Sequence, residues 1–298
     1  MAVERKTRLD GLAVSLLVTC CALWGLNQVA AKVTLVEIPP LMQAAVRSLG
    51  AALLLVLWAQ VRGIGLWQRD GTTRGGLLAG LLFAGEFACI FVGLQYTAAS
   101  RMIVFIYLAP FVVALGMPLI SRSERLQSGQ LLGLLLAFGG VVWAFFEGFE
   151  APAAGPRQWL GDALGIAAAL LWALTTLVLR GSRLSSALPE KTLLWQLLVS
   201  ALALGLGSLA AGEALPAVPG AVSLWLLAFQ TVVVTFASYL VWFWLMRHYP
   251  ATRLSAFTLL TPVFGLLAGV LLLGEPVTAQ LLVALGAVAA GIALVNRS

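Results

Sequence analysis

Apolar runs of membrane-spanning length recur along the whole chain, and short polar segments separate them. Each run holds about 20 residues, the number that an α-helix needs to cross roughly 30 Å of hydrocarbon. The pattern therefore predicts an all-α integral membrane fold with ten transmembrane helices. We place these helices at residues 11–32, 41–61, 76–96, 102–120, 129–146, 161–179, 192–211, 222–246, 254–273 and 279–296.

The first five predicted helices resemble the last five in sequence. Residues 83–98 align without a gap with residues 236–251. Matching positions in the two halves pair Glu86 with Tyr239, Tyr96 with Tyr249, Pro110 with Pro262, and Trp24 with Trp172. A five-helix unit is therefore repeated, with residues 1–146 as the first copy, 147–160 as a periplasmic connection and 161–298 as the second copy.

Five is an odd number, so the second copy enters the membrane from the opposite side and the two repeats are inverted. Inverted repeats typify secondary transporters, in which the substrate site lies near the middle of the membrane between the repeats. Alternating access then follows when the two repeats exchange conformations. Gene duplication in a membrane enzyme or a scaffold would produce the same pattern, and that alternative stays open at this point.

The lysines and arginines support this helix count. With the N-terminus inside, fourteen of the eighteen fall in the predicted cytoplasmic segments, three fall outside, and Arg47 lies within the second helix. An excess of basic residues in short cytoplasmic loops is the positive-inside rule. We therefore expect a protein of the bacterial inner membrane whose N- and C-termini are both cytoplasmic.

Composition argues against several other classes of protein. The chain is 61% hydrophobic and 10% charged, whereas soluble domains have roughly 25% charged residues. The net charge of +6 comes from scattered loop residues, so nucleic acid is not an expected partner. Cys20, Cys21, Cys89 and the single His248 form no metal-binding or disulfide pattern. The sequence carries no P-loop and no hydrolase motif, so we expect no cofactor and no enzyme activity.

Glu86 is the one carboxylate in the middle of a predicted span. An ionisable group there is costly unless it faces a polar cavity or a partner, so Glu86 is a candidate for binding a substrate ammonium or a proton. Arg47 lies roughly 10 Å below the outer end of its helix and is long enough to reach Glu86. A purely structural pair of these two residues is the alternative.

The eighth predicted helix carries a stripe of polar and aromatic residues. Thr231, Thr235, Ser238, Tyr239 and Trp242 share one face of an α-helix, because they follow the spacing i, i+4, i+7, i+8 and i+11. Exposing hydroxyl groups to lipid is unfavourable, so the stripe should face the interior of the bundle. It would line a substrate cavity, with Tyr239 opposite Glu86, or supply hydrogen bonds between helices.

Two prolines lie inside the fourth and ninth predicted helices. Pro110 and Pro262 each remove a backbone hydrogen bond and kink the helix, which creates either a static bend or a hinge.

The other candidates for the cavity wall are Trp24, Asn27, Tyr96, Trp172 and Thr258. For Asn27, contacts between helices are an equal alternative. The cavity should be enclosed by predicted helices 1, 3, 4, 6, 8 and 9. Helices 5 and 10 hold almost no internal polar groups, so they should stand apart and suit packing, lipid contact or a homodimer.

Several short motifs occur in a characteristic order in the two halves. They are Trp24-Gly25-x-Asn27 followed by Lys32, Pro40 followed by Arg47, Leu94-x-Tyr96-Thr97-Ala98-Ala99-Ser100 leading to Pro110, and Leu273-Gly274-Glu275-Pro276. In this order they resemble the EamA-type, ten-helix branch of the drug/metabolite transporter superfamily over essentially the whole chain. One departure is Ser123, which stands before Glu124 where the family usually has glycine.

The resemblance implies a secondary transporter that exports small organic metabolites by alternating access. Within the family the sequence is most similar to the YddG-type exporters of aromatic amino acids, so aromatic or hydrophobic amino acids are the expected substrates. The partners are then a small solute and the lipid bilayer. A carrier of another solute class, such as a sugar, a nucleotide-sugar or a drug, is one alternative, and an intramembrane enzyme is another.

Overall fold

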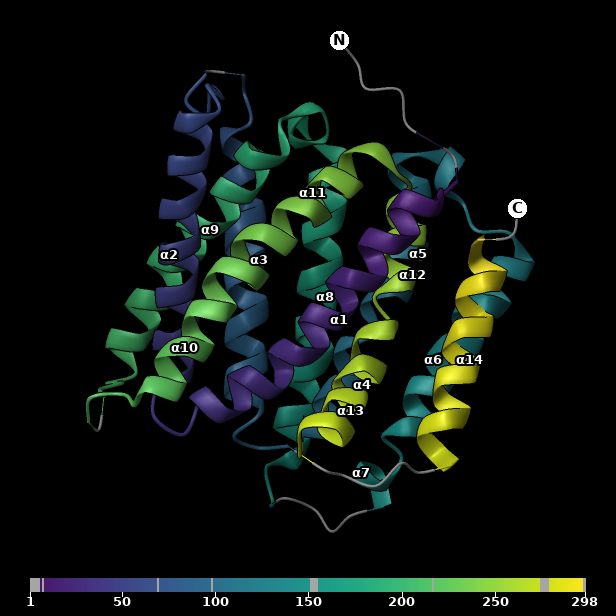
Figure 1. Ribbon diagram of the computed structural model, residues 1–298. Coiled ribbons are helices and arrows are strands. Elements are labelled where there is room, and N and C mark those ends of the chain that lie inside the picture. Colours follow the sequence, from purple (N-terminus) through teal and green to yellow (C-terminus); the bar gives the residue numbers. More distant parts are fainter. Residues whose placement is uncertain are drawn as a thin grey trace.

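The computed structural model in Figure 1 describes residues 6, 8–68, 70–97, 99–150, 155–215, 217–273 and 279–296, and its secondary structure is helical throughout these residues. The first repeat comprises α1 (Gly11–Thr34), α2 (Pro40–Val61), α3 (Thr73–Gly93), α4 (Ala99–Ile106), α5 (Ala109–Ile120), η1 (Arg122–Glu124) and α6 (Ser128–Ala144). A short helix, α7 (Glu147–Glu150), follows. The second repeat comprises α8 (Gln158–Gly181), η2 (Arg183–Ser186), α9 (Pro189–Ala210), α10 (Ala221–Phe229), η3 (Gln230–Ser238), α11 (Tyr239–His248), α12 (Ala251–Phe257), α13 (Leu260–Leu273) and α14 (Ala279–Asn296).

The predicted all-α fold of ten membrane helices is confirmed. Eight helices in the described residues are long and apolar enough to span a membrane, and the stretches 128–144 and 282–296 are shorter apolar helices. The observed ends lie within three residues of the predicted ones. Hydrophobic length and flanking charge therefore suffice to locate the spans.

Contacts between the helices follow the inverted repeat. α1 of the first repeat packs against α13, and its equivalent α8 packs against α4 and α5. Likewise, α3 packs against α8 and α9, while the equivalent segment η3 packs against α1 and α2. α2 packs against its own equivalent α9, and α6 packs against α14. The bundle is thus held together mainly by contacts between the repeats.

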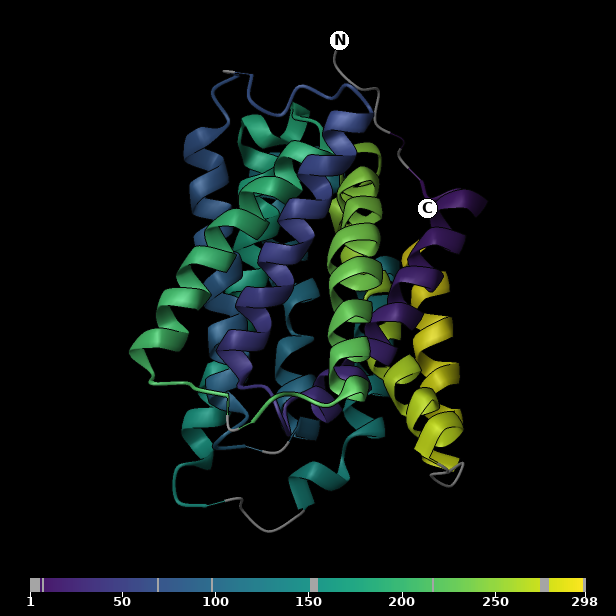
Figure 2. The ribbon, with the colours of Figure 1, turned by 60° about the vertical axis from the view of Figure 1, so that its left-hand side comes forward.

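α6 and α14 lie side by side at one edge of the bundle, as Figures 1 and 2 show. Glycine permits their close approach, since a Cβ on Gly133 would lie 2.6 Å from the carbonyl oxygen of Gly291. The predicted separation of these helices from the main bundle matches this arrangement. A homodimer through them stays a prediction.

Gly133→Ala should destabilise the α6–α14 pair, because its methyl group would clash with the backbone of α14. Overpacking of this kind costs about 1–3 kcal/mol. Gly139→Ala is the matched control on the same helix, since a Cβ there meets nothing within 4 Å and alanine favours helix. Thermal unfolding in detergent should show a lower midpoint for Gly133→Ala alone. Equal midpoints would contradict the packing.

Two of the predicted helices are interrupted at equivalent places. One break separates α4 from α5 just before Pro110, and the other separates α12 from α13 just before Pro262. Proline is tolerated in a first helical turn because its missing N–H has no intrahelical partner there. At the second break, the carbonyl oxygen of Phe257 accepts a hydrogen bond from the Cys21 thiol at 3.4 Å. Movement at these breaks stays a prediction.

The eighth predicted helix is not a continuous α-helix, which corrects the regular stripe expected on it. Between α10 and α11 the nine residues of η3 form a π-helix. A π-helix has i→i+5 hydrogen bonds and is wider than an α-helix, so the α-helical spacing does not hold Thr231 and Trp242 on one face. Such segments occur frequently at functional sites.

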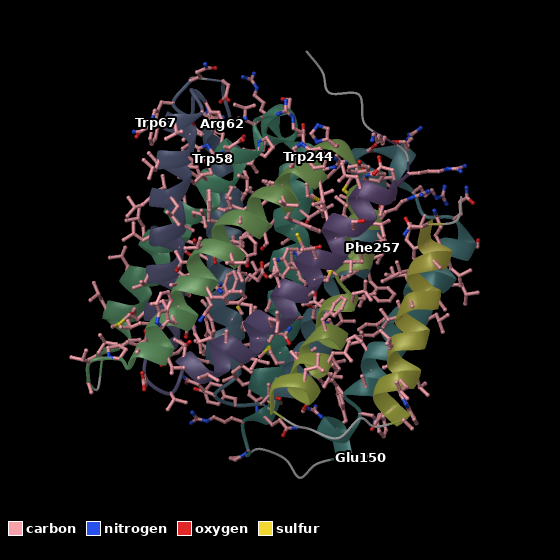
Figure 3. All side chains as sticks on the ribbon, viewed as in Figure 1. Trp58, Arg62, Trp67, Glu150, Trp244 and Phe257 are labelled. Atoms are coloured by element: carbon pink, nitrogen blue, oxygen red, sulfur yellow. The ribbon has the colours of Figure 1, made fainter. Side chains whose placement is uncertain are left out.

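Charged and aromatic side chains lie at the ends of the bundle. α1 begins and α14 ends at the same end, the upper end in Figure 1. Figure 3 shows Trp58, Arg62, Trp67 and Trp244 at this end, and Glu150 at the lower end. Arg62 lies 5.4 Å from the ring centroid of Trp58, and Trp67 is 74% exposed. Tryptophans at the ends of spans are typical of a membrane interface.

Candidate substrate-binding site

A buried arginine and a buried glutamate lie inside the bundle on α2 and α3. Arg47 is 3% exposed and Glu86 is 8% exposed. The guanidinium group of Arg47 lies over the ring of Phe87, 4.4 Å from its centroid. An aromatic face is attracted to a cation, and the attraction is stronger where water is excluded. Phe87 therefore holds the arginine in place without neutralising it.

These two opposite charges do not form an ion pair. In the described part of the chain, no hydrogen bond or N···O contact within 4.0 Å joins Arg47 to Glu86. They nevertheless interact electrostatically with each other and with Tyr239 of the second repeat. The sequence alignment pairs Tyr239 with Glu86, so the cluster contains one residue from each of two matching positions in the repeats.

Aromatic rings from three helices surround this polar cluster. Tyr239 has its ring centroid 6.1 Å from that of Phe83 and 6.1 Å from that of Trp24, both edge to face. Trp24 also lies 5.4 Å from Trp242, and its indole N–H donates a 2.8 Å hydrogen bond to the Ser238 hydroxyl. The aromatic wall, as we call Trp24, Phe83, Tyr239 and Trp242, offers an apolar surface next to the charges.

Two further predicted residues carry buried polar atoms without partners. The hydroxyl oxygen of Thr235 and the side-chain oxygen of Asn27 make no hydrogen bond within the described residues. Buried groups of this kind normally have a partner in the protein or an ordered water. Neither atom has such a partner among the described residues in this conformation.

The other predicted site residues have different neighbours. Thr231 packs against α2, because a Cβ atom added to Gly50 of that helix would lie only 2.8 Å from the Thr231 methyl carbon. Trp172 packs against Tyr107, with ring centroids 5.8 Å apart. Thr258 is fully buried and donates to the carbonyl oxygen of Ser255 at the α12–α13 break. Tyr96 lies in the turn that follows α3.

Gln196 is a central residue that the sequence pattern alone did not single out. It lies seven residues after the proline that begins α9, and Arg47 lies seven residues after the proline that begins α2. Gln196 is 1% exposed, and its amide nitrogen has no partner among the described residues. Alignment of the two prolines would have identified it as the repeat mate of Arg47. Phe83 and Phe87 were missed because phenylalanine in an apolar span gives no signal.

A buried ionic network joins the two repeats at the upper end of the bundle. Arg180, in the last turn of α8, bonds to the Glu124 carboxylate and donates a 2.8 Å hydrogen bond to the carbonyl oxygen of Met246. Glu124 also accepts hydrogen bonds from the backbone N–H and the hydroxyl of Thr252 at 3.3 and 3.2 Å. We call these residues the upper lock.

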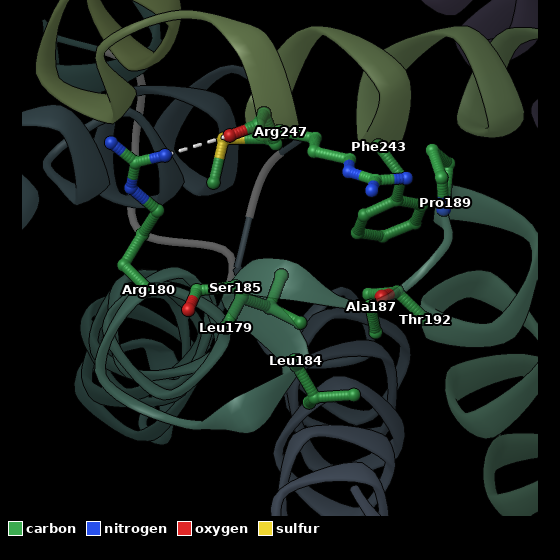
Figure 4. Close-up of a pocket in the computed structure, with 10 residues that line it drawn as sticks. Leu179, Arg180, Leu184, Ser185, Ala187, Pro189, Thr192, Phe243 and Arg247 are labelled. Atoms are coloured by element: carbon green, nitrogen blue, oxygen red, sulfur yellow. Dashed lines mark hydrogen bonds between the residues drawn. The ribbon is translucent and has the colours of Figure 1, made fainter. Parts of the chain in front are cut away.

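Figure 4 shows a pocket beside the upper lock, lined by Arg180, Phe243 and Arg247 among others. Its volume of about 20 Å³ is room for a single water molecule or so. The pocket is therefore too small to hold an organic solute.

A second link at the upper end joins the start of α1 to the end of α11. Asp10 accepts hydrogen bonds from Lys6, from the backbone N–H of Ala13 and from the Tyr249 hydroxyl. These bonds, the one from Lys6 above all, hold the pKa of Asp10 at about 2. Asp10 is therefore ionised at neutral pH and caps α1 as an anion.

The lower end also carries bonds between the repeats. Arg101 of α4 bonds to Asp162 of α8 at 2.5 Å, and the Thr97 hydroxyl donates to the same carboxylate at 2.6 Å. The amide of Gln43 donates a hydrogen bond to the side-chain oxygen of Gln230 at 2.8 Å. Polar contacts thus join the repeats at both ends of the bundle. These contacts would have to break and re-form if the repeats move relative to each other.

The side chain of Lys32 and the residues Glu275 and Pro276 lie outside the described residues.

Two inverted repeats with a buried polar cluster between them are typical of membrane transporters. The sequence matches the EamA-like transporter family over residues 11–146 and 159–297. The chain therefore belongs to this family, which is a family of transporters and not of enzymes, as the sequence predicted.

Individual relatives cover nearly the whole chain. A probable amino-acid metabolite efflux pump of Salmonella typhimurium is 30% identical over 295 residues, which span 96% of this chain and 94% of the relative. The uncharacterized transporter YvbV of Bacillus subtilis is 30% identical over 92% of this chain and 88% of its own length. A protein of known crystal structure aligns with a TM-score of 0.81 at 19% identity, covering 95% of this chain and 97% of the other, and shows that the fold is shared.

Proposed function

We propose that this chain is a secondary transporter that exports amino acids with apolar side chains, aromatic ones above all, by alternating access. The observation that carries the proposal is the Glu86 carboxylate, which has no bonded partner among the described residues and lies beside the aromatic wall. A carboxylate inside a membrane protein is costly without a partner, and a substrate ammonium would supply that partner. The side chain of the same substrate would lie against Tyr239 and Trp242.

The relatives and the site residues favour this solute class. The Salmonella relative is named as a probable amino-acid metabolite efflux pump, and the aromatic wall suits the resemblance to YddG-type exporters. Thr235 and Asn27 would complete the proposed site, since one side-chain oxygen of each has no hydrogen-bond partner among the described residues. Pro110 and Pro262 would serve as the hinges at which the two repeats bend.

In the cell, we take the upper end to be cytoplasmic because most of the basic loop residues belong to it. The upper lock then closes the cytoplasmic side in this conformation. Export would require the lock to open so that a solute can enter from the cytoplasm. Substrate binding would then favour the conformational change that closes the upper lock again, as in this structure.

Counterflow in proteoliposomes tests the proposed function. Vesicles preloaded with unlabelled L-phenylalanine, L-leucine, glucose or putrescine should accumulate the corresponding radiolabelled solute only for the two amino acids. The same assay across a proton gradient separates proton-coupled from facilitated transport. Accumulation of the sugar or the diamine in place of the amino acids would contradict the proposal.

A further inference from the structure

Arg47 differs from the other buried cations that the structure describes. Arg180 is bonded to Glu124, and Lys191 is bonded to Asp70. Arg47 is as deeply buried as these, yet no hydrogen bond or ion pair from it is present within the described residues. A buried charge without a bonded partner is strongly destabilising. The presence of Arg47 at this place therefore points to a partner that is bound only part of the time.

The surroundings of the guanidinium leave its edge available. Phe87 covers one face at 4.4 Å from the ring centroid. Nε is buried and has no acceptor among the described residues, and no hydrogen bond from either terminal nitrogen is present in this part of the chain. The planar guanidinium presents its N–H groups as a fork that matches the two oxygens of a carboxylate. An anion at this edge would satisfy several donors at once.

We propose that Arg47 binds the carboxylate of the transported amino acid and thereby selects α-amino acids over amines and esters with the same side chain. This inference rests on the proposed function, in which Glu86 takes the ammonium group. An α-amino acid carries both charged groups on one carbon, so its site needs an anion and a cation close together but not bonded to each other. Arg47 and Glu86 satisfy this requirement.

The repeat mates explain why the site has one polar side and one apolar side. In the first repeat the two equivalent positions hold Arg47 and Glu86, and in the second they hold Gln196 and Tyr239. The charged pair would bind the backbone end of the substrate, and Tyr239 with its aromatic neighbours would bind the side chain. An amine would leave Arg47 without an acceptor, and a site with an unpaired buried polar group rejects such an analogue.

Substrate selectivity of Arg47→Gln tests this inference. Counterflow of radiolabelled L-phenylalanine is measured with unlabelled L-phenylalanine, its methyl ester or 2-phenylethylamine as competitor. For the wild type, the free amino acid should compete at least tenfold better than the ester or the amine. Arg47→Gln should raise the KM for L-phenylalanine roughly 10- to 100-fold, the loss expected for a charged hydrogen bond, while competition by the amine is retained.

Two further variants make the test independent of folding. Arg47→Lys keeps the positive charge but lacks the planar fork, so it should fold like the wild type and show a reduced preference for the amino acid. Arg62→Gln removes an arginine that also lies over an aromatic ring on α2, but at the end of the bundle, and should leave the preference unchanged.

The outcomes separate this inference from the proposed function. If both Arg47 variants still prefer the amino acid over the amine as strongly as the wild type, Arg47 does not bind the carboxylate. The same conclusion follows if the variants lose affinity for the amino acid and the amine equally. Either result would leave the proposed function intact. A wild type that carries L-phenylalanine without preferring it over the amine and the ester would also overturn the carboxylate role alone. A wild type that carries no amino acid would overturn the proposed function as well.

Discussion

Arg180→Met should strongly destabilise the protein. Removing one member of a buried ion pair leaves the other charge uncompensated, which costs about 3–5 kcal/mol. The two side chains of the pair are 3% and 5% exposed, so water cannot replace the lost partner. The change also removes the hydrogen bond to Met246. The midpoint of thermal unfolding in detergent should fall accordingly.

A double variant distinguishes a lock from a simple packing defect. Glu124→Leu combined with Arg180→Met removes both charges and should be more stable than Arg180→Met alone. Arg122→Met changes an exposed arginine of the same end and should shift the free energy of unfolding by less than about 0.5 kcal/mol. If Arg180→Met and Arg122→Met unfold at the same temperature, the upper lock does not hold the repeats together.

Glu86→Gln should abolish most amino-acid transport while leaving the protein folded. Glutamine keeps the shape of the side chain but cannot balance a substrate ammonium, and losing a charged hydrogen bond corresponds to roughly a tenfold or greater loss of affinity. The fold should persist, because no hydrogen bond or ion pair of Glu86 within the described residues is lost with the charge. Counterflow of L-phenylalanine and thermal unfolding measure the two effects.

Glu150→Gln is the matched control for this change, since Glu150 is an exposed carboxylate at the lower end of the bundle (Figure 3). It should transport like the wild type. Counterflow by Glu86→Gln that is intact, but no longer stimulated by a proton gradient, would assign Glu86 to the proton and contradict the ammonium role.

Much of this fold could be predicted because the membrane constrains features that can be read along the sequence itself. Apolar length fixes each span, the basic loops fix the alternation, and the match of Glu86 with Tyr239 shows the repeat. The breaks before Pro110 and Pro262 follow from the missing N–H of proline. None of these inferences requires knowledge of which helices touch.

The details of the site could not be predicted, because they depend on packing between distant segments. The π-helix η3 lies against α1 and α2, where Trp24 bonds to Ser238. An α-helical spacing would place Thr231 with the site residues, whereas in the structure Thr231 packs against Gly50. That Arg47 stacks on Phe87 and forms no ion pair with Glu86 likewise follows only from the arrangement of α2 and α3.

Direct binding of radiolabelled L-phenylalanine to the purified wild type and to Glu86→Gln tests most directly whether the cluster between the repeats is the substrate site. If it is, the wild type should bind saturably with one site per chain. Glu86→Gln should then bind at least roughly tenfold more weakly. Equal binding by the two proteins, or no saturable binding by the wild type, would contradict a substrate site at this cluster.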